Sequence, residues 1–171
     1  MISVIEHTCL VLRRVISVAV VALFSVMLIA VLVQVAGRYF FGFSIAQAAE
    51  IATYCQIWLV LLGGGVALAR GQHVAIDILP SKLPLAGARA SLLLVAVVAV
   101  AFLAVLAYGS LPLMKMGEFQ TSPALQIPMK YMYACLPIGA AYMILELILS
   151  VIQRWDDPFP EPAPEPEEEA V

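Results

Sequence analysis

Charged residues are scarce in this sequence, and the scarcity decides the class of protein. Only 12% of the 171 residues are Asp, Glu, Lys or Arg, and 63% are hydrophobic. Soluble domains carry about 25% charged and about 45–50% apolar residues. The composition therefore excludes an ordinary soluble domain and predicts an integral membrane protein. A chain of this length leaves no room for a second, soluble domain beside it.

Cysteines and metal ligands are equally sparse. Cys9, Cys55 and Cys135 lie far apart, form no CxxC pair, and are interpreted as small apolar fillers. His73 and Asp77 stand four residues apart, but two ligands without a third do not make a zinc site. A membrane enzyme would need a titratable cluster in one loop, and only these two residues come near one. The sequence predicts no catalytic residue, no metal and no cofactor.

A basic patch is missing as well. The formal net charge is −3, and the five glutamates within residues 158–171 more than account for it. No cluster of Lys and Arg is large enough to indicate nucleic-acid binding. The same stretch alternates proline with other residues and cannot bury apolar surface. Residues 156–171 are therefore predicted to be a disordered acidic tail behind a membrane domain of residues 1–155.

Four long apolar runs dominate what is present. About 20 residues at 1.5 Å per residue cross the roughly 30 Å hydrocarbon layer. The predicted spans cover residues 15–36, 51–69, 90–114 and 131–152. The expected fold is an all-α integral membrane protein with four transmembrane helices. The segment before the first span fits a short interfacial helix, and the first span is too long for a cleaved signal peptide.

The loop cations predict the orientation. With the N-terminus in the cytoplasm, six of the nine Lys and Arg lie on the cytoplasmic side. This distribution follows the positive-inside rule, so both termini are predicted to be cytoplasmic. The loop within residues 63–84 then faces the cytoplasm, and the loops 37–50 and 115–130 face the outside.

Glu146 is the one charged residue within the predicted spans. It lies near the cytoplasmic end of the fourth span, about two turns from Arg154. We favour a side chain that reaches the interface or pairs with a neighbour. The alternative is a proton or cation relay in a self-sufficient small transporter acting as a homo-oligomer. No basic or carboxylate partner in another predicted span supports that relay.

Small residues indicate where helices pack. Gly63, Gly64 and Gly65 stand together in the second span, although each glycine costs about 1 kcal/mol in a helix interior. Gly63 and Ala67 form a small-xxx-small face that permits close helix contact in lipid, and residues 139–141 offer a matching surface. Helix packing is favoured here over a ligand cavity.

The outer loops carry two further features. Arg38 either pairs with Glu50 across the first loop or does not, and both interpretations stay open. Ser122 followed by Pro123 suits a helix N-cap and first helical position. Pro128 then precedes the last span, so this loop is predicted to present a fixed surface.

These residues give the chain a family resemblance. It resembles the DctQ-like small membrane subunit of tripartite ATP-independent periplasmic (TRAP) transporters. The matching residues are Arg38-Tyr39, Ser44, Glu50, Trp58, Gly63, Ala67-x-x-Arg70-x-x-His73-x-x-x-Asp77, Leu83-Pro84, Ser122-Pro123-Ala124-Leu125-x-Ile127-Pro128, Tyr133, Pro137 and Gly139. Family members often carry a Trp and two consecutive acids in the first loop, where this chain has Gln47 and Ala49 before Glu50.

The resemblance implies a non-catalytic subunit of a bacterial inner membrane, embedded in the lipid bilayer. Its expected partners are a large membrane subunit of about twelve spans, which carries the substrate and sodium sites, and a periplasmic protein that delivers an organic acid. The expected contact residues are Trp58, Gly63, Gly64, Gly65, Ala67, Pro137 and Gly139 for subunit packing, Arg38, Tyr39, Ser44, Glu50, Ser122, Pro123 and Pro128 in the periplasmic loops, and Arg70, His73, Asp77 and Pro84 in the cytoplasmic loop.

Overall fold

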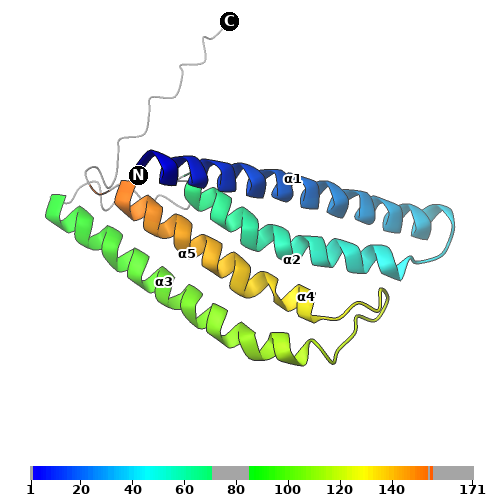
Figure 1. Ribbon diagram of the computed structural model, residues 1–171. Helices are drawn as coiled ribbons and strands as arrows, with labels where there is room; N and C mark the ends of the chain where they lie inside the picture. Colours follow the sequence, from blue (N-terminus) through cyan, green and yellow to red (C-terminus); the bar gives the residue numbers. More distant parts are fainter. Residues whose placement is uncertain (1, 71–84, 154, 156–171) are drawn as a thin grey trace, which may run out of the picture.

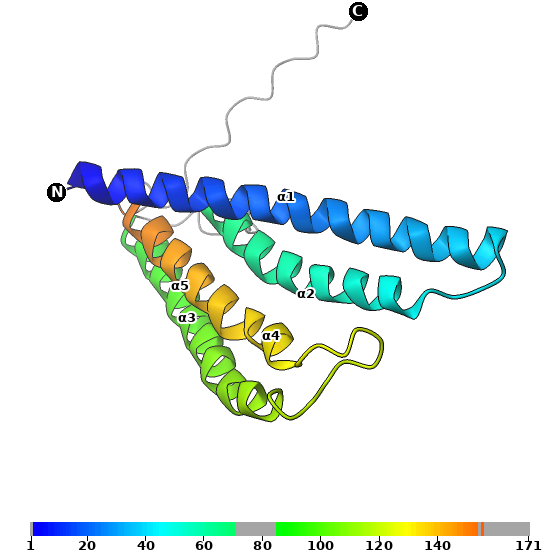
Figure 2. The same cartoon turned by 45° about the vertical axis from the view of Figure 1, so that its right-hand side comes forward.

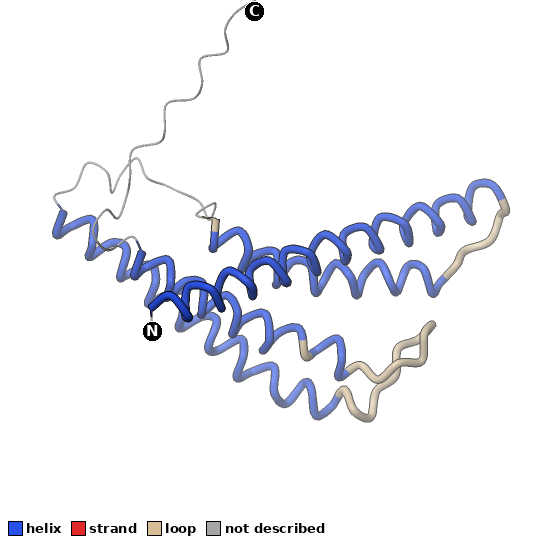
Figure 3. Tube along the Cα trace, turned by 45° about the horizontal axis from the view of Figure 1, so that its top comes forward, coloured by secondary structure: helices blue, strands red, loops and turns tan. Residues whose placement is uncertain are grey.

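The computed structural model describes residues 2–70, 85–153 and 155. The backbone of these residues is mainly helical, and the two loops that join the helices at one end of the molecule are drawn in tan in Figure 3. His73, Asp77 and Pro84, as well as the predicted tail of residues 156–171, lie outside the described residues. Their predicted roles therefore stay predictions.

Four helical rods make up the described part of the chain. They are α1 (Ile2–Phe40), α2 (Ala46–Ala69), α3 (Leu85–Met116), and a fourth rod built from α4 (Lys130–Tyr133) and α5 (Cys135–Gln153). Each rod is long and apolar enough to cross a membrane. The prediction of an all-α fold with four membrane-crossing helices is confirmed for these residues, and the orientation of the termini stays a prediction.

The helices extend beyond the predicted spans. Helix α1 has 39 residues, which at 1.5 Å per residue makes it about 58 Å long. A separate interfacial helix before the first span was the wrong prediction, because the helix runs unbroken from Ile2. Charged side chains end a hydropathic run but do not interrupt backbone hydrogen bonds. Helix α2 likewise begins at Ala46, so the first outer loop shrinks from the predicted 37–50 to 41–45.

Proline divides the fourth rod. Pro137 stands in the first turn of α5 and has no N–H to continue the hydrogen-bond ladder back to Tyr133. The helix is interrupted at Ala134, whose N–H donates to the carbonyl of Lys130 at 2.9 Å. Pro112 does not end α3, which continues to Met116.

The four rods form an open row. Helix α1 packs on α2, α2 on α5, and α5 on α3, and Figure 1 shows them in this order. Within the described residues, the edge helices α1 and α3 make no contact with each other, and Figure 2 shows their ends far apart beside the two outer loops. The arrangement is a single curved layer, so both of its faces are open.

Close packing between the rods depends on small side chains. Six of the ten buried apolar residues in the described part are alanines, which allow helix backbones to approach in lipid. Large apolar side chains on the edge helices point outward instead, among them Val18 at 64% and Val105 at 71% exposure. The row therefore leaves most of its apolar surface exposed, where lipid or another protein can cover it.

Two glycines set the contact between the central helices. A Cβ on Gly65 would lie 2.3 Å from the ring of Tyr142, and a Cβ on Gly139 would lie 2.6 Å from the Cβ of Leu61. Neither position has room for a side chain. The other two glycines of the triplet are less confined, since a Cβ on Gly63 would meet its nearest atom at 4.0 Å. The seam between α2 and α5 thus runs through Gly65 and Gly139.

Candidate functional site

The second outer loop is folded into a compact hairpin. The N–H of Ser122 donates to the carbonyl of Ile127 at 2.9 Å, and the N–H of Met129 donates to the carbonyl of Gln120 at 2.9 Å. Gln126 adopts a left-handed backbone with φ of 57°, and its side-chain amide donates to the Pro123 carbonyl at 3.0 Å. These local bonds define one conformation for the loop of residues 120–129.

Glu50 joins this loop to α2. One carboxylate oxygen of Glu50 accepts the N–H groups of Ala124 at 2.9 Å and Leu125 at 2.7 Å. The other oxygen accepts the hydroxyl of Tyr54, one turn along α2. Hydrogen bonds to an ionised group are roughly twice as strong as neutral ones. Glu50, in the second turn of α2, therefore ties together two segments separated by about 75 residues.

The helix start predicted in this loop is only a turn, and Glu50 supplies its cap. Ser122 and Pro123 were expected to begin a helix, but residues 123–125 make a single turn that goes no further. An N-cap side chain would accept the N–H groups two and three positions on, which here belong to Ala124 and Leu125. Glu50 accepts both from a different helix. The buried Ser122 hydroxyl instead accepts the N–H of Ile127 at 3.3 Å.

The open question of an Arg38–Glu50 pair is thereby answered. Both carboxylate oxygens of Glu50 are occupied by Tyr54 and by the loop backbone, and Arg38 is exposed at the end of α1. Ser44 is exposed as well, and Tyr39 is 78% exposed. Aromatic residues at this end suit the headgroup layer. The predicted periplasmic residues thus gather at one end of the row, without an ion pair between Arg38 and Glu50.

A second polar site lies near the opposite end. The Arg13 guanidinium binds both carboxylate oxygens of Glu146, with Nε 3.0 Å from each oxygen and an Nη 2.7 Å from Oε2. Glu146 is only 1% exposed and Arg13 is 24% exposed. The pair connects α1 to α5, which are not neighbours in the row. It therefore bridges across the end of α2.

The favoured interpretation, that Glu146 pairs with a neighbour, is confirmed, but the partner was not foreseen. The sequence suggested no basic partner in another span and pointed to Arg154, which lies outside the described residues. The partner is Arg13, which the prediction had assigned to the lead-in before the first span. The signal that would have found it is the absence of proline and glycine between residues 2 and 36. With both oxygens engaged, Glu146 is poorly suited to exchange a proton with water.

The described residues offer few side chains that could bind a metal or a cofactor. Residues 2–70, 85–153 and 155 hold no group of three or more His, Cys, Asp or Glu within reach of one ion. Cys9, Cys55 and Cys135 are free thiols. Of the predicted cytoplasmic residues, only Arg70 is described, and it is exposed just after α2.

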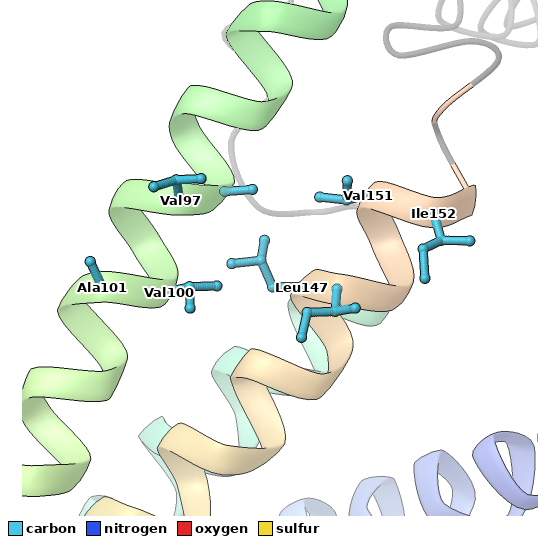
Figure 4. A pocket seen from close by; sticks show the side chains of 8 residues that line it. Val97, Val100, Ala101, Leu147, Val151 and Ile152 are labelled. Carbon is cyan, nitrogen blue, oxygen red and sulfur yellow. The ribbon is translucent and has the colours of Figure 1, made fainter.

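An apolar groove lies between α3 and α5 (Figure 4). Its volume is about 430 Å³, and every lining side chain is aliphatic. Val97 and Val100 of α3 face Leu147 and Val151 of α5 across it. Such a surface suits an acyl chain or aliphatic side chains, and it offers no group for chemistry.

The chain is similar in sequence to known proteins of one family. The model of the family "Tripartite ATP-independent periplasmic transporters, DctQ component" matches residues 27–157. A putative TRAP transporter small permease protein of Haemophilus influenzae is 33% identical over 73 residues, which are 43% of this chain and 45% of that protein. Another protein of that description from the same organism is 25% identical over 120 residues, covering 70% of this chain and 73% of its own length.

A third relative is much longer. The isethionate TRAP transporter permease protein DctMQ of Oleidesulfovibrio alaskensis is 33% identical over 101 residues, 58% of this chain but only 16% of that protein. The chain thus spans less than half the length of two of these three relatives.

Proposed function

Because the chain belongs to the DctQ component family of the tripartite ATP-independent periplasmic transporters, we propose that it is the auxiliary membrane subunit of a secondary transporter that takes up organic acids with a cation gradient. Family membership supports a role as a transporter subunit. With the four membrane-crossing helices, it also confirms the predicted multi-pass location in the bacterial inner membrane.

The proposed partner is a large TRAP membrane subunit of about twelve spans. The relative named DctMQ supports this, since its matched part is only 16% of a much longer permease chain. The proposal assigns the transport pathway to the large subunit. In the described spans of this chain, the one buried carboxylate is held by Arg13.

The open row of helices is the observation that carries a scaffolding role. A closed bundle buries its own apolar faces, whereas this row leaves both edges and both faces uncovered. Lipid covers some of that surface, and a larger subunit that moves during transport needs a fixed body to move against. The close contacts of α2 and α5 at Gly65 and Gly139 and the Arg13–Glu146 pair support a rigid layer of this kind.

The hairpin of residues 120–129 supports a second part of the proposal, assistance in docking the periplasmic binding protein. Glu50 holds this hairpin in one conformation before any partner arrives, which lowers the entropy lost on binding. Phe119 beside it is 91% exposed. Arg38, Tyr39 and Ser44 are exposed at the same end and complete the proposed surface.

Reconstitution tests the proposal. Proteoliposomes are prepared with the large subunit alone, with this chain alone, and with both, and uptake of a labelled organic acid is followed with the binding protein and a sodium gradient. The substrates include a C4-dicarboxylate, sialic acid and isethionate, the last because one relative is named for it. Uptake is expected only when both membrane subunits are present. Transport by this chain alone would overturn the auxiliary role.

The same experiment addresses the alternative of a self-sufficient, proton-coupled homo-oligomer. That alternative needs Glu146 to gain and lose a proton, and its bidentate bond with Arg13 and its 1% exposure do not favour this. Uptake by this chain alone that Glu146→Gln abolishes would support the alternative instead.

A further inference from the structure

Helix α2 presents an amide to the surroundings at a depth where water is absent. Gln56 stands ten residues after the start of α2 and thirteen before its end. At 1.5 Å per residue it lies about 15 Å from one end and about 20 Å from the other, inside the hydrocarbon layer. The side chain is exposed, and among the described residues its amide has no hydrogen-bond partner.

A lone amide in this place requires an explanation. Each unsatisfied polar group in hydrocarbon costs several kcal/mol. Thr53, on the same face of α2, avoids that cost because its hydroxyl donates to the Ala49 carbonyl at 3.0 Å. Gln56 has two donors and one acceptor, and α1 and α5 supply nothing for them. Lipid tails cannot satisfy the amide either.

The surroundings of Gln56 form one stripe along α2. Thr53, Gln56 and Val60 follow the i, i+3, i+7 spacing of a single helix face, and all three are exposed. This stripe, called the Gln56 face below, lies away from the seam with α5, which runs through Gly65.

We propose that the Gln56 face of α2 is covered by a transmembrane helix of the large subunit, which presents a hydrogen-bonding side chain to the Gln56 amide. Polar side chains that bond across helices are a recognised source of association in lipid. The inference rests on the proposed function, because that function supplies the partner. It adds which helix, which face and which contact chemistry join the two subunits.

The first test compares two variants of the same face. This chain is co-expressed with the large subunit, and the dissociation constant of the complex is measured in nanodiscs. Gln56→Leu is expected to weaken the complex about threefold to thirtyfold, the value of one interhelical hydrogen bond in lipid. Thr53→Val is the matched control, and is expected to leave the affinity unchanged because the Thr53 hydroxyl is already bonded within α2.

A second measurement separates binding from folding. The isolated Gln56→Leu chain is expected to be as resistant to unfolding as the natural chain, or more so, because the substitution removes an unpaired amide from lipid. Weaker association together with undiminished stability supports the proposal. Equal affinity of Gln56→Leu and the natural chain overturns it.

Photocrosslinking identifies the occupant. A benzophenone amino acid is placed at Val60 on the Gln56 face and, for comparison, at Val98 on α3; the two side chains are 60% and 61% exposed. A crosslink from position 60 to the large subunit supports the proposal. A crosslink to a second copy of this chain, or to lipid only, overturns it.

The proposed function and the assignment of the Gln56 face are contradicted by different results. If the natural chain does not associate with the large subunit at all, both the proposed function and the inference about the Gln56 face are wrong. If it associates but crosslinks only from position 98, the proposed function stands and the assignment of the Gln56 face is wrong.

Discussion

Glu146 and Glu50 are two acids at opposite ends of the row, and they are stabilised in opposite ways. Glu146 is buried and faces a charged partner, Arg13, on a distant helix. Glu50 accepts backbone N–H groups from a loop and a hydroxyl from its own helix. Both connect segments that are far apart in the sequence, one by a pair of charges and the other by capping a turn.

The difference teaches what each end of the molecule does. A bidentate ion pair between helices fixes the position of one rod against another, so the Glu146 end is a structural clamp. A carboxylate that caps a loop turn fixes the shape of an exposed surface, so Glu50 fixes the surface that is proposed above for docking. Removing Glu146's partner should therefore affect global stability, whereas changing Glu50 should affect one loop.

The largest effect is expected at the clamp. Arg13→Met leaves Glu146 buried without its partner, and breaking one half of a buried pair costs about 3–5 kcal/mol. Unfolding of the purified chain in detergent is the measurement. Arg14→Met, at an exposed neighbouring position, is the control and should stay within about 0.5 kcal/mol of the natural chain. Equal losses from both variants would contradict the clamp.

Packing beside the clamp gives the next largest effect. Gly65→Ala would place a Cβ 2.3 Å from the ring of Tyr142, one turn before Glu146, and overpacking of this kind costs about 1–3 kcal/mol. Gly63→Ala meets its nearest atom only at 4.0 Å and should be neutral or stabilising. Unfolding midpoints of the two variants measure the difference. Tyr142→Leu should restore Gly65→Ala, and a failure to do so would point to a different obstruction.

The capped loop should respond locally. Glu50→Gln removes the charge that strengthens the bonds from the Ala124 and Leu125 N–H groups, and it replaces the oxygen that accepts the Tyr54 hydroxyl with an amide nitrogen. Hydrogen bonds to a charged group are roughly twice as strong as neutral ones. Hydrogen exchange of the amides of Ala124 and Leu125 should accelerate about tenfold or more. The unfolding midpoint should change little. A global loss of stability with unchanged exchange in the hairpin would reverse the roles assigned to the two acids.

The smallest effect is expected from a surface pair near the same loop. Glu118 and Lys130 approach to 3.7 Å, with side chains 57% and 39% exposed. Exposed pairs of this kind contribute about 0–1 kcal/mol, so Glu118→Gln should change neither hairpin exchange nor unfolding measurably. It is the matched control for Glu50→Gln, because both remove one negative charge at this end.

The sequence was sufficient to predict the four helical rods, but not where each rod begins and ends or the order in which they pack. Apolar run length predicts a membrane-crossing helix because lipid leaves the backbone few alternatives. It does not reveal that α1 continues back to Ile2, since Arg13 and Arg14 lower hydropathy without breaking a helix. The open row of helices could not be predicted from the sequence either. The order of the helices depends on which residues contact one another across helices, and the spacing of apolar residues along the chain does not reveal this.

The site was predicted in part for the same reason. Glu50, Ser122 and Pro123 were singled out as outer-loop residues, but the only partner considered for Glu50 was Arg38, and that pairing was left open. A carboxylate in a sequence suggests a cationic partner, whereas the partners of Glu50 in the second loop are backbone N–H groups about 75 positions away. Glu146 was singled out too, and its partner was missed because Arg13 had been assigned to a lead-in outside the span.

The length of α1 gives the Arg13–Glu146 pair a further consequence. At about 58 Å, helix α1 is much longer than the roughly 30 Å hydrocarbon layer is thick. A shift of α1 along its own axis by one turn, about 5.4 Å, would pull Arg13 out of reach of Glu146. The ion pair therefore sets the axial register of α1 against α5, and with it how far the two helices project past each other.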